Sequence, residues 1–167
     1  MKTLISISIY LFLSINLYGQ LTKRLQKFLK SDSIVIVSHE ATDGVPIVED
    51  SAGERIKPPQ LLFSGKLNDT IIKERKRLDP LFSNRLVKIL SRPFEDKTII
   101  EGSCFNPHHA ILFYNKGNIS YIDLCFGCHV FVTTKNLDFI DSFDKKKWRQ
   151  LEDFFKGLGV TYEMPLN

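Results

Sequence analysis

The sequence predicts an α+β fold, in which an antiparallel β-sheet built from hairpins and a meander packs against about three amphipathic helices. One observation is the hairpin pattern between residues 110 and 126, where two runs of β-branched and aromatic residues flank an Asn-Lys-Gly-Asn turn. A second observation is that apolar residues recur at helical spacing near the beginning, the middle and the end of the chain. The predicted strands fall in groups between these helices, which favours an antiparallel sheet over alternating βαβ units.

Residues 1–19 have the pattern of a secretory signal peptide. Lys2 precedes an apolar run from Leu4 to Leu17, and the small residue Gly19 follows that run. Because the run is shorter than the ~20 residues that span a bilayer, it predicts a cleaved signal and no stable membrane anchor. We therefore expect an exported protein, periplasmic or extracellular, with residues 20–167 forming a single α+β domain.

The composition is that of a globular protein with a modest positive charge. Apolar residues make up 43% of the chain and charged residues 25%, which argues against a disordered chain. The formal net charge of +4 is too small to indicate a nucleic-acid partner. The basic run at residues 73–77 is interrupted by Glu74, so we interpret it as solvated surface.

The first half of the domain is predicted to hold one helix and several short strands. The predicted elements are a helix at 21–29 and strands at 33–38, 45–48, 60–63 and 70–72, with a turn at 65–69 before the last strand. Glycine and proline punctuate residues 39–59, which predicts a long loop around the brief second strand. His39 opens this loop without a partner nearby in the sequence, and we expect it on the surface.

The second half begins with a well-marked helix. The predicted elements are a helix from Asp79 to before Pro93, strands at 98–100, 110–114, 119–126 and 129–133, and a last helix starting near Ser142. Asp79 is suited to cap the free amides of the first helix, and Pro80 to its first turn. Ser142 is the expected cap of the last helix, whose apolar face includes Trp148.

The central hairpin can be assigned a register from its turn. If Lys116 and Gly117 are the two turn residues, Asn115 lies opposite Asn118, and the two strands pair outward from there. The face expected in the core carries Ile111, Phe113, Ile122, Leu124 and Phe126. The opposite face carries His108, Tyr114, Tyr121, Asp123 and Cys125.

Every cysteine and three of the four histidines gather near the open end of this hairpin. They are Cys104, His108, His109, Cys125, Cys128 and His129. An odd number of cysteines in an exported chain leaves one thiol outside any intramolecular disulfide. Cys104 lies nearly opposite Cys128 in the predicted register, so the first hypothesis is a Cys104–Cys128 disulfide that stabilises the hairpin.

Three other chemistries for this cluster stay open. Cys104, His109, Cys125 and Cys128 form a ligand set suited to tetrahedral zinc, and four protein ligands would make that site structural. Cys125 and Cys128 also have the C-x-x-C spacing of thiol-redox proteins, although those proteins place the motif at a helix N-terminus. With His129 the same string has the form of a c-type haem attachment site, but the strand-rich context disfavours haem.

The second half of the chain also resembles a known pattern. The segments that carry it are Cys104-Phe-Asn-Pro-His-His-Ala-Ile111, Phe113-Tyr114 and Tyr121-Ile-Asp-Leu-Cys-Phe-Gly-Cys128. They are similar to an uncharacterised group of exported bacterial proteins with a C-F-x-P-R-H-A/G-I motif, a hairpin, a C-F-x-C motif and a final amphipathic helix. The group implies no known activity. This chain has His108 in place of the group's arginine, which makes His109 the better imidazole candidate.

These patterns predict an exported binding, interaction or structural protein whose Cys/His cluster is stabilised by a disulfide. We expect no enzymatic activity, because the chain lacks G-x-S-x-G, H-E-x-x-H and a carboxylate pair at a recognised spacing. A partner, either a protein or a small ligand, is expected on the loop at 39–59 or on the polar face around Tyr121 and Asp123. We expect no cofactor; a zinc-binding or thiol-redox protein is the alternative.

Overall fold

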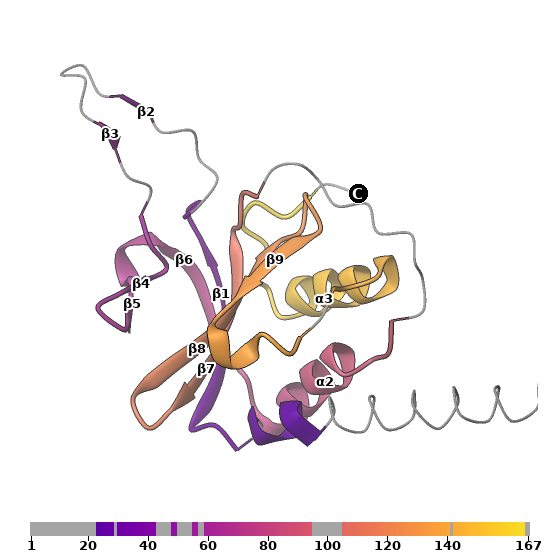
Figure 1. The fold of residues 1–167 in the computed structure, drawn as a ribbon. Coiled ribbons are helices and arrows are strands. Elements are labelled where there is room, and N and C mark those ends of the chain that lie inside the picture. The colour runs from indigo at the N-terminus through magenta and orange to yellow at the C-terminus, as the bar shows by residue number, and fades with distance from the viewer. Residues whose placement is uncertain are drawn as a thin grey trace, which may run out of the picture.

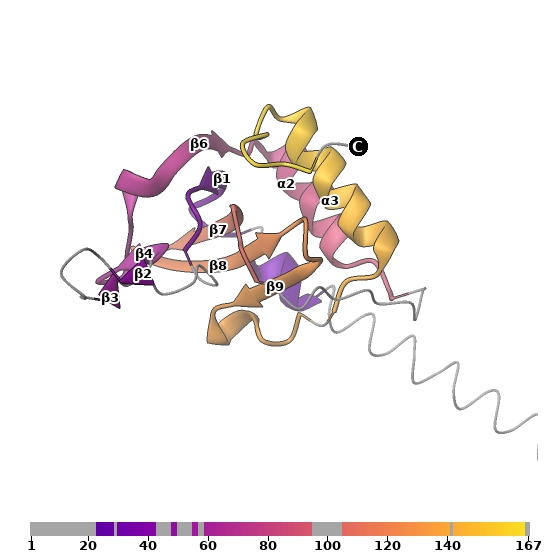
Figure 2. The same cartoon turned by 90° about the horizontal axis from the view of Figure 1, so that it is seen from above.

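The computed structural model describes residues 23–28, 30–42, 48–49, 55–56, 59–94, 105–140 and 142–165. The strands of the main sheet are β1 Ser33–His39, β6 Ile72–Arg77, β7 His109–Asn115, β8 Asn118–Cys125 and β9 Val130–Thr133. They form one antiparallel sheet in the order β6-β1-β7-β8-β9. The helices α2 Pro80–Leu90 and α3 Lys145–Gly157 lie side by side against one face of this sheet (Figure 1, Figure 2). The predicted α+β class is confirmed.

Short elements complete the described part of the chain. They are the helical residues 23–28, the paired strands β2 Val48–Glu49 and β3 Arg55–Ile56, the paired strands β4 Leu62–Phe63 and β5 Lys66–Leu67, and the 3-10 turns η1 Asp69–Ile71 and η2 Lys135–Leu137. The predicted signal peptide at 1–19, the strand at 98–100 and Cys104 lie outside the described residues.

The β7–β8 hairpin follows the predicted register. Asn115 faces Asn118, Ile111 faces Ile122 and His109 faces Leu124. Lys116 and Gly117 have φ angles of 49° and 80°, the left-handed values that a type I′ turn requires. Local turn chemistry therefore sets the pairing of the two longest strands.

The predicted core face of the hairpin packs under the two helices. Ile111, Phe113, Ile122, Leu124 and Phe126 are all buried there among the apolar residues of α2 and α3. Leu25 from the first helical segment is fully buried in the same cluster. The opposite face is also covered, because Val37, Ala110 and Leu112 pack with Leu61 from the segment before β4.

Aspartate side chains cap the N-termini of α2 and α3. Asp79 caps α2 and Pro80 follows it, as predicted; the Asp79 side chain accepts a hydrogen bond from the amide of Phe82. The cap of α3 is Asp144, not the predicted Ser142, and its carboxylate accepts from the amide of Lys147 at 2.8 Å. Asp144 is fully buried and also pairs with Arg92, which follows α2, so tertiary contacts selected it as the cap.

Residues 73–77, predicted as solvated surface without a strand, belong to a strand. β6 extends from Ile72 to Arg77 at the edge of the sheet and pairs only with β1. Its lysines and arginines are exposed, so the run is solvated as expected while its backbone completes the sheet. Charged side chains on an edge strand discourage pairing with other chains, and they also hide the apolar alternation by which strands are recognised.

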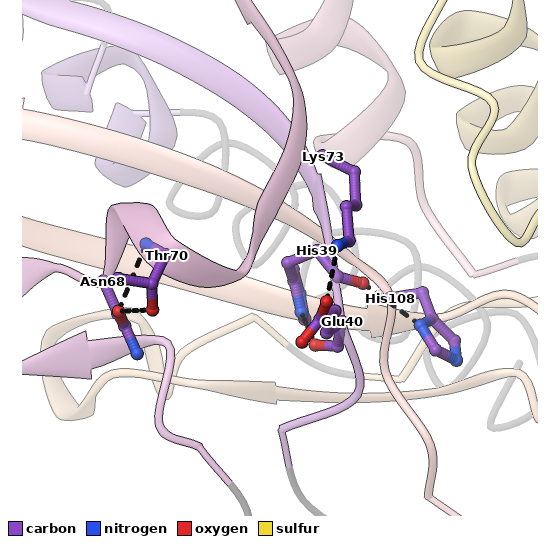
Figure 3. Close-up of polar contacts among 6 residues, drawn as sticks. All are labelled: His39, Glu40, Asn68, Thr70, Lys73 and His108. Carbon is purple, nitrogen blue, oxygen red and sulfur yellow. Dashed lines mark hydrogen bonds and ion pairs between the residues drawn. The ribbon is translucent and has the colours of Figure 1, made fainter.

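The turn predicted at 65–69 is shorter than expected and begins earlier. Ser64 and Gly65 have φ angles of 51° and 76° and join β4 to β5 in a two-residue turn. η1 follows, where the side chain of Asn68 accepts hydrogen bonds from both the amide and the hydroxyl of Thr70 (Figure 3). The apolar residues around 70–72 therefore divide between a 3-10 turn and the start of β6.

Candidate functional site

A disulfide joins Cys125 and Cys128 across the turn that links β8 to β9. The two Cα atoms are 5.3 Å apart, and the amide of Cys128 also donates to Sγ of Cys125 at 3.2 Å. This pairing differs from the predicted Cys104–Cys128 disulfide. The strand β8 ends at Cys125 and the chain turns back at once, which brings the sulfur atoms of a C-x-x-C pair together without help from a distant residue.

A cavity of about 460 Å³ lies beside this disulfide and is called here the disulfide cavity. Its lining residues are Asn106, His108, His109, Cys125, Phe126, Gly127, Cys128, Glu163, Met164 and Pro165. The cavity therefore gathers the described residues of the predicted cluster at the open end of the hairpin, apart from His129. It also recruits three residues from the end of the chain that the sequence did not associate with the cluster.

His109 forms a buried wall of the disulfide cavity. Its residue surface is only 1% exposed, and its ring makes edge contacts with Phe126 and Phe155 at centroid distances of 5.0 and 5.6 Å. Burial lowers the pKa of His109 to about 3, and the coulombic interactions with His39 and His108 act in the same direction. The ring is therefore neutral at physiological pH.

The two cavity histidines have different hydrogen-bond states. His109 bonds to the backbone of Tyr162, while its Nε2 has no partner among the described residues. His108 is satisfied at both nitrogens. Its Nδ1 lies 3.1 Å from the main-chain oxygen of His39 (Figure 3). Its Nε2 lies 3.2 Å from Nδ2 of Asn106. The free lone pair of the cavity wall thus belongs to His109.

The chain end that closes the cavity is held by one carboxylate. Glu74 of β6 accepts hydrogen bonds from the amides of Thr161 and Tyr162 at 2.7 and 2.9 Å, and from the hydroxyl of Ser38 at 2.6 Å. Burial alone would raise the pKa of Glu74, but the hydrogen bonds from Ser38, Tyr162 and Thr161 outweigh it and leave the pKa lowered. The ionised carboxylate therefore fastens residues 161–162 to the sheet.

A second buried polar group lies on the opposite face of the sheet. His39 is fully buried, not on the surface as predicted, and its Nε2 lies 3.0 Å from Oδ1 of Asp123. Nδ1 of His39 lies 2.7 Å from the main-chain oxygen of Glu40, and Thr42 donates to Oδ2 of Asp123. Asp123 is 2% exposed, so the predicted polar face is closed at this residue. Tyr121, the other residue of the predicted face, is half-buried.

The predicted zinc and haem sites are not assembled by the described residues. No group of three or more His, Cys, Asp or Glu side chains able to hold a metal occurs in the described part of the chain. Cys104 lies outside that part, so the four-ligand zinc site stays a prediction. His129 does not line the disulfide cavity and packs instead against Trp148, with ring centroids 5.5 Å apart.

The fold and this site define a small disulfide-containing α+β protein. A comparison with protein-family models, curated proteins and solved structures finds no match to this chain. Its resemblance to the group of exported bacterial proteins accordingly stays a prediction. Over the described ranges, no helix has the length and apolar character needed to cross a membrane.

Proposed function

We propose that this chain is an exported, non-enzymatic binding protein whose ligand occupies the disulfide cavity. The observation that carries the proposal is that His109, a lining residue of the cavity, has a buried Nε2 atom without a partner in the described residues. Buried polar atoms are nearly always hydrogen-bonded, so such an atom marks a place where a ligand supplies the missing bond. A volume of about 460 Å³ is within the range of small-molecule sites.

The disulfide supports both the location and the compartment. A bond that closes only the four-residue loop from Cys125 to Cys128 constrains the unfolded chain weakly, by about 2 kcal/mol in the loop-entropy model. Its stronger effect is local, because it fixes the turn that forms one wall of the cavity. Disulfides persist in oxidising compartments, which agrees with the export predicted from residues 1–19.

The test is to titrate the uniformly ¹⁵N-labelled protein with a set of small fragments and follow the backbone amide signals and the histidine ring signals by NMR. We expect hits to shift the signals of His109 and His108 before any other histidine. The cavity of about 520 Å³ lined in part by Asp32, Asp79 and Asn84 serves as an internal control for non-specific binding. A set that binds only there, or nowhere, would refute the proposal.

A second function, thiol–disulfide exchange, is favoured by the position of both half-cystines in the cavity wall. An external thiolate would attack one sulfur atom, the Cys125–Cys128 bond would break, and a mixed disulfide would form while the other cysteine leaves as a thiolate. We expect native protein in glutathione buffers to show the mass of a glutathione adduct or of the reduced pair. A mass unchanged in excess reduced glutathione would exclude this function.

A further inference from the structure

The chemistry of the disulfide cavity restricts the ligand, and this inference rests on the binding function proposed above. The backbone bond of His109 raises its pKa, so Tyr162 contributes its carbonyl oxygen and the ring donates to it. Because only Nδ1 can be the donor when Nε2 is unpartnered, Nε2 carries the lone pair. The buried wall therefore offers an acceptor.

The other described side chains of the cavity lining offer one uncharged donor, the second amide hydrogen of Asn106, and no cationic donor. Nδ1 of His108 faces the carbonyl oxygen of His39 and so carries that ring's proton. Nε2 of His108 is then an acceptor, and it takes the amide hydrogen of Asn106. The disulfide and the thioether of Met164 have no polar hydrogen.

The charge of the cavity lining also favours a ligand that donates hydrogen bonds. Glu163 is an exposed residue of the lining and brings a carboxylate, and the described lining contains neither lysine nor arginine. A ligand that carries only acceptors, such as a carboxylate or a phosphate, would meet a lone pair and a negative charge. A ligand with a positive donor would satisfy both.

We propose that the disulfide cavity binds a small organic primary ammonium ion, which donates a hydrogen bond to Nε2 of His109 and lies close to the carboxylate of Glu163. The cavity volume favours an organic cation over a bare metal ion, since about 460 Å³ is far more than one ion fills. Phe126, Pro165 and the disulfide provide apolar surface for the carbon part of such a ligand.

The experiment uses three probes of one shape, namely benzylammonium, benzyl alcohol and benzoate, titrated into the full exported chain by calorimetry and histidine-ring NMR. We expect benzylammonium to bind about tenfold more tightly than benzoate, with benzyl alcohol between them. Benzoate binding as tightly as benzylammonium, with the His109 signal shifted, would overturn the ligand class and leave the binding function standing. No shift of the His109 signal by any probe or fragment would overturn both.

Two variants separate the two contacts. His109→Phe keeps the ring packing against Phe126 and Phe155 but removes the lone pair, so binding of benzylammonium and of benzyl alcohol should each weaken about tenfold. Glu163→Gln changes an exposed side chain without risk to the fold, and it should weaken benzylammonium alone, about two- to fivefold. An equal effect of Glu163→Gln on benzyl alcohol, or none on benzylammonium, would contradict the role of the charge.

Discussion

His39 and His109 are both enclosed by protein, yet their ring nitrogens meet different surroundings. Both nitrogens of His39 face acceptors. Nε2 faces the carboxylate of Asp123, and Nδ1 faces the carbonyl of Glu40. His109 meets aromatic rings and one backbone bond. The first histidine is therefore bonded into the fold, whereas the second lines a cavity and has one buried ring nitrogen without a partner among the described residues.

The lowered pKa of His109 makes stability depend on pH. The unfolded chain takes up a proton near pH 6.5, whereas the folded ring does so only near pH 3. The stability contributed by the neutral ring is thus present above pH 6.5 and lost as the pH falls toward 3, by up to ~1.4 kcal/mol per pH unit. We expect His109→Phe to remove this slope between pH 6.5 and 4.5 in urea unfolding followed by the fluorescence of Trp148. Parallel curves for the two proteins would contradict the assignment.

The His39–Asp123 pair should be coupled strongly, because both side chains are almost fully enclosed. Removing one partner takes away a buried ion pair, so Asp123→Asn or His39→Gln should each lower the free energy of unfolding by about 3 kcal/mol. In a double-mutant cycle the two losses should fall short of additivity by more than ~1 kcal/mol. Additive losses would show that the two side chains act independently.

Sequence analysis could not find this pair, and the reason is distance along the chain. His39 and Asp123 are separated by 84 residues and meet because β1 and β8 both pair with β7. The predicted register placed Asp123 on the correct face, but only the position of β1 beside β7 shows what that face meets. A signal existed in the alternation of β1, which puts His39 on the same side as Val35 and Val37.

At the scale of elements, α2 and α3 begin with the same residue type in different surroundings. Asp79 is exposed and acts as a cap, whereas Asp144 is buried and also neutralises Arg92. We expect Asp79→Ala to cost about 1 kcal/mol and Asp79→Asn almost nothing, since asparagine caps equally well. Asp144→Asn keeps the cap but removes the buried ion pair with Arg92, and should cost at least ~2 kcal/mol in chemical unfolding. Equal effects of the two asparagine variants would rule out the ion pair as a stabilising contact.

The chain end after α3 should depend on the charge of Glu74. The lowered pKa of Glu74 means that its contribution is present above pH 4.5 and is lost as the pH falls through the lower folded value. We expect Glu74→Gln to speed amide hydrogen exchange at Thr161 and Tyr162 about tenfold at neutral pH. The matched control is Glu40→Gln. Glu40 is an exposed residue whose carboxylate forms an ion pair with Lys73 (Figure 3), so this variant should leave the exchange rates of these amides unchanged. Unchanged exchange in Glu74→Gln would mean that other contacts hold the segment.

Elements were predictable where the determining information is local. The hairpin register followed from Lys116-Gly117, and α2 followed from Asp79-Pro80 and its apolar stripe. β6 was missed because an edge strand pairs through its backbone, and its side chains show charge and not alternation. The α3 cap was misplaced by two residues because burial against Arg92, which no local pattern contains, favours Asp144 over Ser142.

On the scale of the whole molecule, the disulfide cavity forms where three distant segments meet. The hairpin supplies its histidines, the turn after β8 its disulfide, and the residues after α3 its rim. The gathering of the histidines and cysteines was predictable because one hairpin brings them together, but the predicted disulfide was Cys104–Cys128 and not Cys125–Cys128. The rim could not be predicted, because the position of Glu163 and Met164 depends on where α3 packs on the sheet. It also depends on the hydrogen bonds by which Glu74 holds residues 161–162.

The position of the disulfide in the fold determines how much of the fold depends on it. Cys125 and Cys128 close four residues at one end of the sheet, and the main core cluster includes residues of α2, α3 and three strands without them. We expect Cys125→Ala/Cys128→Ala to stay folded, with about 2 kcal/mol lost in unfolding, and to bind cavity ligands less well because the wall is no longer fixed. A Cys104–Cys128 bond would instead close a loop of about 25 residues and contribute about 3.5 kcal/mol.

Alkylation of the native protein without reductant, followed by peptide mapping, distinguishes the two pairings. If Cys125 and Cys128 are bonded, a single alkyl group should appear, and it should map to Cys104. Modification of Cys125, with a cross-link between the peptides of Cys104 and Cys128, would establish the other pairing. In that case the cavity wall would be held by a bond across the open end of the hairpin, and Cys125→Ala alone would leave both stability and ligand binding nearly unchanged.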